Sequence, residues 1–207
     1  MQYNCILDDA ARARHALAEK ILWACCPEMM QRKFPRANVQ QAFIFDAVRR
    51  FAPFPGPILC AGCFEDTACA AFHALEYDVT GIDPEVNGVD LRMFTEHHLQ
   101  TQAPLFSAVF STSVIEHVPD DLQFLRDMMS LTRPGGVLLL TTDFHSMGPQ
   151  NGMRFYKEDD LQRLAALIES SGWSLLDQPR WSNAIPDFAL LGLTYNFATF
   201  GARRGSS

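Results

Sequence analysis

One stretch of the chain, residues 57–90, constrains the fold more than any other. It begins with a short apolar run that ends at Gly62, continues through a segment with helical spacing, and returns to an apolar run that ends at Asp83. A short apolar run bounded by proline and glycine is typical of a buried strand. Strand, glycine turn, helix and a second strand that ends in an acid together predict a βαβ unit of the kind that binds nucleotides.

The residues of the first turn indicate which nucleotide this unit favours. Gly62 allows the backbone to approach a ligand, and the carboxylate of Asp83 is placed to accept hydrogen bonds from a ribose diol. A pyrophosphate cradle needs the pattern G-x-G-x-x-G, whereas here Gly62 is followed by Cys-Phe-Glu-Asp. Two carboxylates, Glu65 and Asp66, suit a helix N-terminus but repel a phosphate. The turn therefore favours a phosphate-free nucleoside with a positive charge, such as S-adenosylmethionine, over NAD.

Composition and charge set the class of protein. The 207 residues are 48% hydrophobic, which suits one globular domain with a substantial core. The net charge of −7 gives no electrostatic footprint for nucleic acid or acidic membranes, and no apolar run is long enough to span a bilayer. The first residues show no signal-peptide pattern, so we expect a cytoplasmic protein with reduced cysteines. Cys60 and Cys63 form one C-x-x-C pair, for which a redox or metal role is the alternative.

The remaining segments continue the alternation of helices and strands. Residues 1–35 are interpreted as a helical segment and residues 36–207 as the main domain. The helical segment is expected to pack on the core as a surface helix, with a lid over the substrate pocket as the alternative. The further expected elements are helices at 38–50, 92–99, 120–131 and 157–171, strands at 89–91, 106–112, 137–142 and 173–176, and a final strand or hairpin arm at 188–202.

Three motifs give the chain a resemblance to a known family: ILCAGC followed by IDP, FSAVFSTSVIEHV, and RPGGVLLLTTDF. Together they resemble the class I S-adenosylmethionine-dependent methyltransferases, over residues 38–203. The first motif, extended to ILCAGCFEDTA, also looks like that of small methyltransferases from bacterial surface-polysaccharide clusters. The resemblance implies an α/β fold: a Rossmann-like three-layer sandwich around a mostly parallel, seven-stranded sheet whose last strand is antiparallel.

The resemblance also implies cofactor-binding positions at the carboxyl ends of the strands. Asp83 would take the ribose hydroxyls, and Asp90 with Leu91 would meet the adenine; capping of the next helix is the alternative for Asp90. Arg36 is expected either to reach a ligand carboxylate or to be a solvated surface charge. The full set of expected cofactor contacts is Arg36, Ala61, Gly62, Cys63, Phe64, Asp83, Pro84, Asp90, Leu91, Ser111, Thr112 and Ser113.

Two departures from the family pattern concern the charge of the site. The family more often has an acid where this chain has Cys60, and glycine where it has Phe64 and Asp66. Glu65 or Asp66 is then the alternative partner of the cofactor's ammonium group. Some relatives bind a divalent ion through E-x-x-E-H, whereas this chain reads S-x-x-E-H, with Ser113 in the first place. Losing one carboxylate should weaken such a site severely, so no metal is expected.

Catalytic candidates follow from the chemistry that the resemblance implies. Methyl transfer from a sulfonium is an in-line displacement that demands mainly positioning, and a hydroxyl acceptor also needs a base. His145, just beyond a strand end beside the expected cofactor, is the first candidate for that base, with a hydrogen-bonded loop histidine as the alternative. Glu116 and His117 are the further catalytic candidates. Substrate contacts are expected from Asp143, Arg154 and Tyr156, with a structural role as the alternative for the last two.

Two functions from different classes fit these observations. The first is a methyltransferase that acts on an oxygen of a small polar molecule or saccharide. The second is a protein that keeps the fold, binds the nucleoside weakly or not at all, and serves as a partner subunit; the altered glycine turn favours it. A nicotinamide-dependent oxidoreductase is disfavoured by the missing glycine pattern. No nucleic-acid partner is expected, and the oligomeric state, a homo-oligomer included, is open.

Overall fold

The computed structural model describes residues 2–52, 56–182, 186–190 and 192–206. Its strands are β1 (Ile6–Leu7), β2 (Ile58–Ala61), β3 (Val79–Ile82), β4 (Phe106–Thr112), β5 (Thr132–Phe144), β6 (Trp173–Leu175), β7 (Phe188–Leu190) and β8 (Leu193–Arg204). Its helices are α1 (Asp9–Cys25), α2 (Pro27–Arg32), the 3₁₀ turn η1 (Pro35–Asn38), α3 (Val39–Phe51), α4 (Thr67–Ala74), α5 (Pro84–Asn87), α6 (Leu91–Gln100), α7 (Asp121–Leu131) and α8 (Glu158–Ser170).

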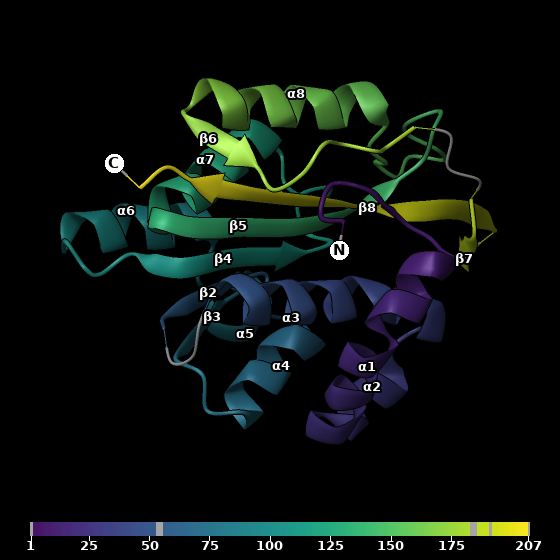
Figure 1. Ribbon diagram of the computed structural model, residues 1–207, viewed down its shortest axis with the longest axis horizontal. Coiled ribbons are helices and arrows are strands. Elements are labelled where there is room, and N and C mark those ends of the chain that lie inside the picture. Colours follow the sequence, from purple (N-terminus) through teal and green to yellow (C-terminus); the bar gives the residue numbers. More distant parts are fainter. Residues whose placement is uncertain (1, 53–55, 183–185, 191, 207) are drawn as a thin grey trace.

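Helices cover both faces of one central sheet (Figure 1). Helices α1 to α4 share one apolar core with the sheet, and α6 to α8 share a second core on the opposite face. The longer helices bury their apolar stripes against the sheet, which gives the three-layer α/β arrangement that the sequence predicts. Among the helices of the described residues, none combines the length and the apolar character that crossing a membrane requires.

The order of the strands confirms the expected Rossmann-like fold. The sheet runs β1-β8-β5-β4-β2-β3, and β6 and β7 also pair with β8. Neighbouring strands from β3 to β5 are parallel, whereas β8 is antiparallel to β5, as expected for the last strand. The carboxyl ends of the parallel strands meet at one edge of the sheet, and ligands of open α/β sheets bind at this edge.

The described sheet has eight strands where seven were expected. Short strands β1 and β7 are additions, and both pair with β8. The expected strand at 89–91 is wrong. Asp90 Oδ1 accepts a hydrogen bond of 2.7 Å from the backbone N–H of Met93 and so caps α6, whose first residue is Leu91. The link from β3 is therefore one short helix, α5, and a left-handed Gly88.

Acidic side chains begin α4 and α7, as the sequence predicts. Asp66 caps α4 by accepting from the backbone N–H of Cys69 at 2.7 Å, and Asp120 caps α7 by accepting from that of Gln123 at 2.9 Å. The cap expected at Asn38 is not formed, because this residue is the helical last residue of η1 and makes no side-chain capping bond. The 3₁₀ turn instead leads directly into α3.

Strand β8, near the C-terminus, pairs with β1, near the N-terminus. Residues 188–202, expected as a final strand or a hairpin arm, form the hairpin of β7 and most of β8. At its outer side β8 pairs with Ile6 and Leu7, and the backbone N–H of Thr199 donates to the carbonyl of Cys5 at 2.9 Å. A two-residue strand has no periodicity to detect, so this pairing could not be predicted from the sequence.

Candidate active site

Two adjoining cavities lie at the carboxyl ends of β2, β3 and β4. Their volumes are about 420 and 490 Å³, and they share Gly62, Asp83 and Val114. The first cavity is also lined by Ala61, Ile82, Pro84, Val89, Asp90, Leu91, Arg92, Val118, Pro119, Asp120, Gln123, Phe124 and Asp127. The second is also lined by Lys33, Phe34, Ala37, Gln40, Gln41, Phe64, Glu65, Asp66, Glu85, Thr112, Ser113 and His117. The two cavities therefore border each other at the three residues that they share.

The turn after β2 brings backbone close to these cavities. Gly62 has a φ of 90°, and a Cβ atom at this position would lie 2.3 Å from Cγ2 of Val114. Both the conformation and the lack of space therefore require glycine. The turn is fixed by the carbonyl of Ile82, which accepts from the backbone N–H groups of Gly62 and Cys63 at 2.8 and 3.1 Å. A methyl group of Val114 thus packs directly against the main chain of Gly62 in the wall that both cavities share.

Asp83 ties the same turn to the end of β3. Its Oδ2 accepts from the backbone N–H of Phe64 at 3.2 Å, and its Oδ1 accepts from that of Glu85 at 2.8 Å. The carboxylate lines both cavities, so it is held at their junction. Carboxylate oxygens can accept further bonds at this position, which is the geometry expected of a diol-binding acid.

Asp66 is a buried acid in the wall of the second cavity, with only 4% of its surface exposed. Its Oδ1 caps α4, but Oδ2 and the hydroxyl of Thr112 have no hydrogen-bond partner among the described residues. Burial raises the pKa of Asp66, while the N–H of Cys69, the nearby Thr112 and the charge of Lys33 act in the opposite direction. Buried polar atoms without partners are rare and call for an explanation.

Glu65, the neighbouring acid, is already paired. Its carboxylate lies 3.0 Å from Nε of Arg32 and 3.9 Å from Nζ of Lys33. Of the two acids in the turn, Asp66 is therefore the one that retains an unpartnered oxygen beside the cavity.

A buried glutamine supports the floor of the second cavity. Oε1 of Gln40 accepts from the hydroxyls of Ser113 and Thr141 at 2.6 and 2.7 Å. Ser113 itself has a φ of 50°, in the left-handed region that non-glycine residues seldom adopt. Such strain persists where surrounding bonds hold it, and it is frequent at functional sites. The glutamine therefore fixes the orientation of Ser113 at the end of β4.

Two further carboxyl groups, the buried Glu116 and the half-buried Asp143, lie together at the end of β5. Glu116 accepts from the hydroxyl of Thr142 and from the backbone N–H of Asp143, both at 3.1 Å. Burial raises the pKa of both acids, and burial followed by the charge of Glu116 raises that of Asp143 to about 8. Burial, and then these two acids, also raise the pKa of Tyr195. Neither carboxyl group is among the walls of the two cavities.

Arg154 and Tyr156, expected at the substrate, are bound to Asp121 at the start of α7. Asp121 accepts from Nη2 of Arg154 and, at 2.9 Å, from the hydroxyl of Tyr156. Arg163 of α8 bonds the same carboxylate at 2.8 Å. The guanidinium of Arg154 also lies 5.0 Å from the centre of the Tyr156 ring. These contacts match the structural alternative for the pair and leave both outside the walls of the two cavities.

The structure brings together most, but not all, of the residues expected at the site. The expected residues that line a cavity are Ala61, Gly62, Phe64, Asp83, Pro84, Asp90, Leu91, Thr112, Ser113 and His117. Arg36 is not among the walls, since it bonds Asp9 and Asp187 on the surface. The hydroxyl of Ser111 instead donates to the carbonyl of Ala61 at 2.7 Å.

His145 also lies outside the walls of both cavities. Its Nδ1 accepts from the backbone N–H of Met147 at 3.1 Å, and its ring centre lies 6.0 Å from that of Phe155. Its backbone N–H donates to the carbonyl of Tyr156. These contacts match a hydrogen-bonded loop histidine, which is the alternative to a catalytic base. Of the three catalytic candidates, His117 is the one in a cavity wall.

The surroundings of Cys60 and Cys63 raise the pKa of both thiols and so favour the protonated form. Cys60 is fully buried in β2, and burial, followed by a hydrogen bond with Cys69, raises its pKa well above the ordinary value. Burial raises the pKa of Cys63 to about 11. Cys63 packs beside Gly81 and Cys69 rather than in a cavity wall. Because the thiolate is the reactive form, these contacts argue against the redox alternative for the C-x-x-C pair.

Some residues of the cavity walls were not expected from the sequence. Lys33 and Phe34 end the N-terminal helical segment, and Gln40 lies in the first turn of α3. No motif marks these three residues, because they lie far in sequence from the strands and only the tertiary fold brings them to the strand ends. A polar Gln40 on a helix face that is otherwise buried was the one available signal.

An open α/β sheet with a glycine turn and an acid at adjacent strand ends defines a class of nucleotide-binding domains. A family model described as a methyltransferase domain matches residues 36–188. The chain therefore belongs to this family, the class I S-adenosylmethionine-dependent methyltransferases, and S-adenosylmethionine is its cofactor.

Curated relatives match part of the chain. The ubiquinone biosynthesis O-methyltransferase of Methylocella silvestris is 36% identical over 110 residues, which cover 45% of this chain and 43% of the relative. The protein of the same name from Parvibaculum lavamentivorans is 38% identical over 55 residues, or 27% of this chain and 22% of the relative. The chain thus matches less than half the length of these relatives.

Solved structures share the fold across most of the chain. The [4+2]-cyclase SpnF has a TM-score of 0.54 and 14% identity, with 95% of this chain and 97% of that chain covered. The 1,6-didemethyltoxoflavin-N1-methyltransferase of Burkholderia thailandensis has a TM-score of 0.53 and 14% identity, with 94% and 89% covered. At these identities the likeness shows the architecture alone.

Proposed function

We propose that this domain transfers the methyl group of S-adenosylmethionine to an oxygen atom of a small acceptor. The observation that carries the proposal is the pair of adjoining cavities at the strand ends, with Gly62 and Asp83 in the wall that they share. When bound, the cofactor supplies an electrophilic methyl group on a cationic sulfur. The name of the matched relatives, which are O-methyltransferases, supports oxygen as the acceptor atom.

The first cavity suits the adenosine. Its apolar walls include Val89, Leu91 and Val114, which can cover the faces of a purine. Asp90 uses Oδ1 to cap α6, so we assign its other oxygen to the adenine amino group. Asp83 would accept from the ribose hydroxyls. A methyl group of Val114, which also lines this cavity, packs against Gly62 where a Cβ would lie, so the glycine allows this wall to form; the carboxylates and apolar walls present fit the nucleoside.

The second cavity suits the amino-acid end of the cofactor. Asp66 would accept from the ammonium through its unpartnered Oδ2, with the hydroxyl of Thr112 beside it. Lys33, in the same cavity wall, would meet the carboxylate. Asp66 thus takes the part of the acid that is absent at Cys60. A charge-assisted bond to a buried carboxylate is among the stronger single contacts available to a ligand.

The acceptor would enter the second cavity beyond the sulfonium. Phe34 and Phe64 stand in its wall with 55% and 59% of their surfaces exposed, and flat apolar surfaces of this kind stack on rings. We therefore propose a small alcohol that carries a ring, a saccharide included. His117, in the same wall, would take the hydroxyl proton as the new carbon–oxygen bond forms. Gln40, through Ser113, would hold the floor in place.

Calorimetry with S-adenosylmethionine and its demethylated product tests the proposal. We expect micromolar binding of both by the native chain, and a loss of about tenfold or more in Asp83→Asn, because a carboxylate that bonds the diol is removed. Asp78→Asn is the matched control, since Asp78 is an exposed acid just ahead of the same strand. Absence of heat with both compounds would support the alternative, a partner protein that keeps only the fold.

A further inference from the structure

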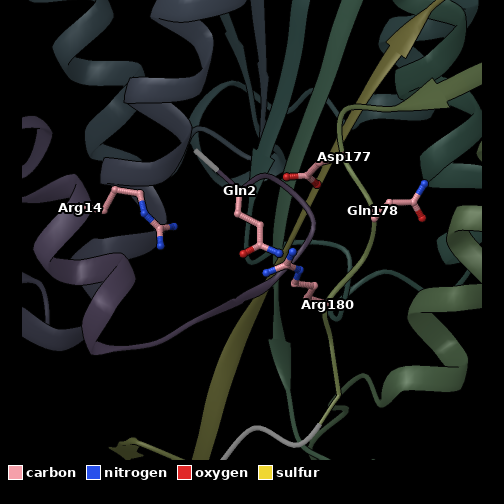
Figure 2. A pocket seen from close by; sticks show the side chains of 5 residues that line it. All are labelled: Gln2, Arg14, Asp177, Gln178 and Arg180. Carbon is pink, nitrogen blue, oxygen red and sulfur yellow. The ribbon is translucent and has the colours of Figure 1, made fainter.

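A third cavity, of about 520 Å³, lies apart from the two at the strand ends and shares no lining residue with them. Its walls are Gln2, Arg14 of α1, and Asp177, Gln178 and Arg180 of the segment after β6. Figure 2 shows the side chains of Arg14 and Arg180 reaching from two different segments toward the space around Gln2. The cavity is therefore formed where the two ends of the chain meet.

The two arginines of this cavity have no side-chain partner. Both are exposed, and among the described residues neither Arg14 nor Arg180 makes an ion pair or a side-chain hydrogen bond, whereas Arg12 and Arg36 both bind Asp187. The chain as a whole carries a net charge of −7, so a cavity with two unpaired guanidinium groups is unusual in it. Guanidinium groups that no protein carboxylate pairs are available to bind an anion.

The one acid in the cavity is already engaged. Oδ2 of Asp177 accepts from the backbone N–H of Tyr3 at 2.7 Å. Its Oδ1 accepts from the backbone N–H and the side-chain amide of Asn4 at 3.0 and 2.9 Å. Three N–H donors thus hold the carboxylate against the N-terminal segment, and it makes no ion pair with Arg14 or Arg180 within the described residues.

The walls of the cavity are fixed to the sheet. Asn4 is fully buried, and its side chain bonds both the N–H and the carbonyl of Gly201 in β8, at 2.9 and 3.1 Å. The backbone N–H of Arg180 donates to the carbonyl of Asn4 at 2.8 Å. These bonds set the backbone from which Arg180 projects, while the helical backbone of α1 sets the position of Arg14, so the backbone on both sides of the cavity is held before a ligand binds.

We propose that this cavity binds a phosphate group, free or carried by a small molecule, between Arg14 and Arg180. Each guanidinium can present two parallel N–H groups, and a tetrahedral oxyanion has enough oxygens to receive both forks at once. The amide of Gln2 adds a further donor at the centre of the cavity. The site is separate from methyl transfer and does not depend on the proposed function.

Calorimetry with inorganic phosphate, and in a second arm with glycerol phosphate, tests this site at constant ionic strength. We expect saturable binding by the native chain and a loss of at least about tenfold in the double variant Arg14→Gln, Arg180→Gln. The matched control is Arg126→Gln, Arg133→Gln, which removes the same charge from two exposed arginines that likewise have no side-chain partner in the described part of the chain. Tighter binding in the second arm would identify a phosphorylated small molecule as the ligand.

Three results would overturn the assignment: no saturable heat with either phosphate compound, equal weakening in both double variants, or undiminished binding by the Arg14, Arg180 variant. Binding of the demethylated cofactor is measured on the same samples. It should be unchanged in both variants, so a failure of the phosphate site can be told apart from a failure of the proposed methyl transfer.

Discussion

The turn after β2 and the end of β5 carry similar polar side chains but use them differently. At the turn, Asp83 and Asp66 stand in cavity walls, and Asp66 keeps an oxygen without a partner. At the end of β5, Asp143 lies outside both cavity walls with its backbone N–H bonded to Glu116, and beyond it the side chain of Arg154 is bound to Asp121. Position at a strand end is therefore not sufficient for contact with a ligand. The partners that the fold supplies decide which groups remain available.

Gly62→Ala should have the largest effect at the turn. The new Cβ would meet Val114 at 2.3 Å and would sit at a φ of 90°, so cofactor binding should be lost and stability should fall by about 1–3 kcal/mol. Gly88→Ala is the control, because its φ is 71° but nothing lies within 4 Å of a Cβ there. Calorimetry and urea unfolding measure the two effects. Equal losses in the two variants would contradict a special role for the space at Gly62.

His117→Gln should test the ranking of the two histidines, since the sequence places His145 first and the cavity wall contains His117. If His117 takes the acceptor proton, its loss should lower kcat by about 100-fold or more while cofactor affinity is kept. His145→Gln should leave kcat nearly unchanged, because this ring is bound in its own loop. Steady-state kinetics with a ring-bearing alcohol as acceptor measures both. The reverse ranking would return His145 to the first place.

Asp66→Asn tests whether the unpartnered oxygen is a ligand group. Asparagine keeps an oxygen to cap α4, so the fold should persist, while affinity for the demethylated cofactor should fall by about 10- to 100-fold. Methylthioadenosine, which has no amino-acid end, should bind the native chain and the variant equally. Glu65→Gln is the control, since that acid is paired with Arg32. A loss that is the same for both ligands would show a structural role instead.

The pair of Glu116 and Asp143 should make the stability of the fold depend on pH. The pKa of Asp143 is about 8 in the folded chain and about 3.9 when unfolded, so the folded state holds the extra proton between these values. Its contribution to stability is therefore present at low pH and is lost as pH rises toward 8. In Asp143→Asn the free energy of unfolding should fall less steeply between pH 5 and 8. An unchanged slope, compared with Asp78→Asn, would contradict the shift.

The architecture was largely predictable from residues close together in sequence. Apolar runs, the glycine turn at Gly62 and the acids that cap α4 and α7 are local signals, and the structure contains them all. Asp90 shows the limit of such signals, because a carboxylate at a strand end and one at a helix start look alike in sequence. Asp90 caps α6, and this helix begins where the third strand was expected.

The sequence predicted only the part of the site that the local βαβ pattern defines. Gly62 and Asp83 follow from the βαβ pattern, but the burial of Asp66 and the bonds of Gln40 depend on helices far away in sequence. Arg36 shows the same limit, since its partner Asp187 lies in the C-terminal part of the chain. The proposal that residues 1–35 form a lid stays a prediction.

A crystal structure of the chain soaked with the demethylated cofactor tests the central claim most directly. The account predicts adenine in the cavity lined by Val89 and Leu91, ribose at Asp83, and the ammonium within hydrogen-bond distance of Asp66 Oδ2. Empty cavities at saturating ligand, or a nucleoside bound elsewhere on the molecule, would contradict it.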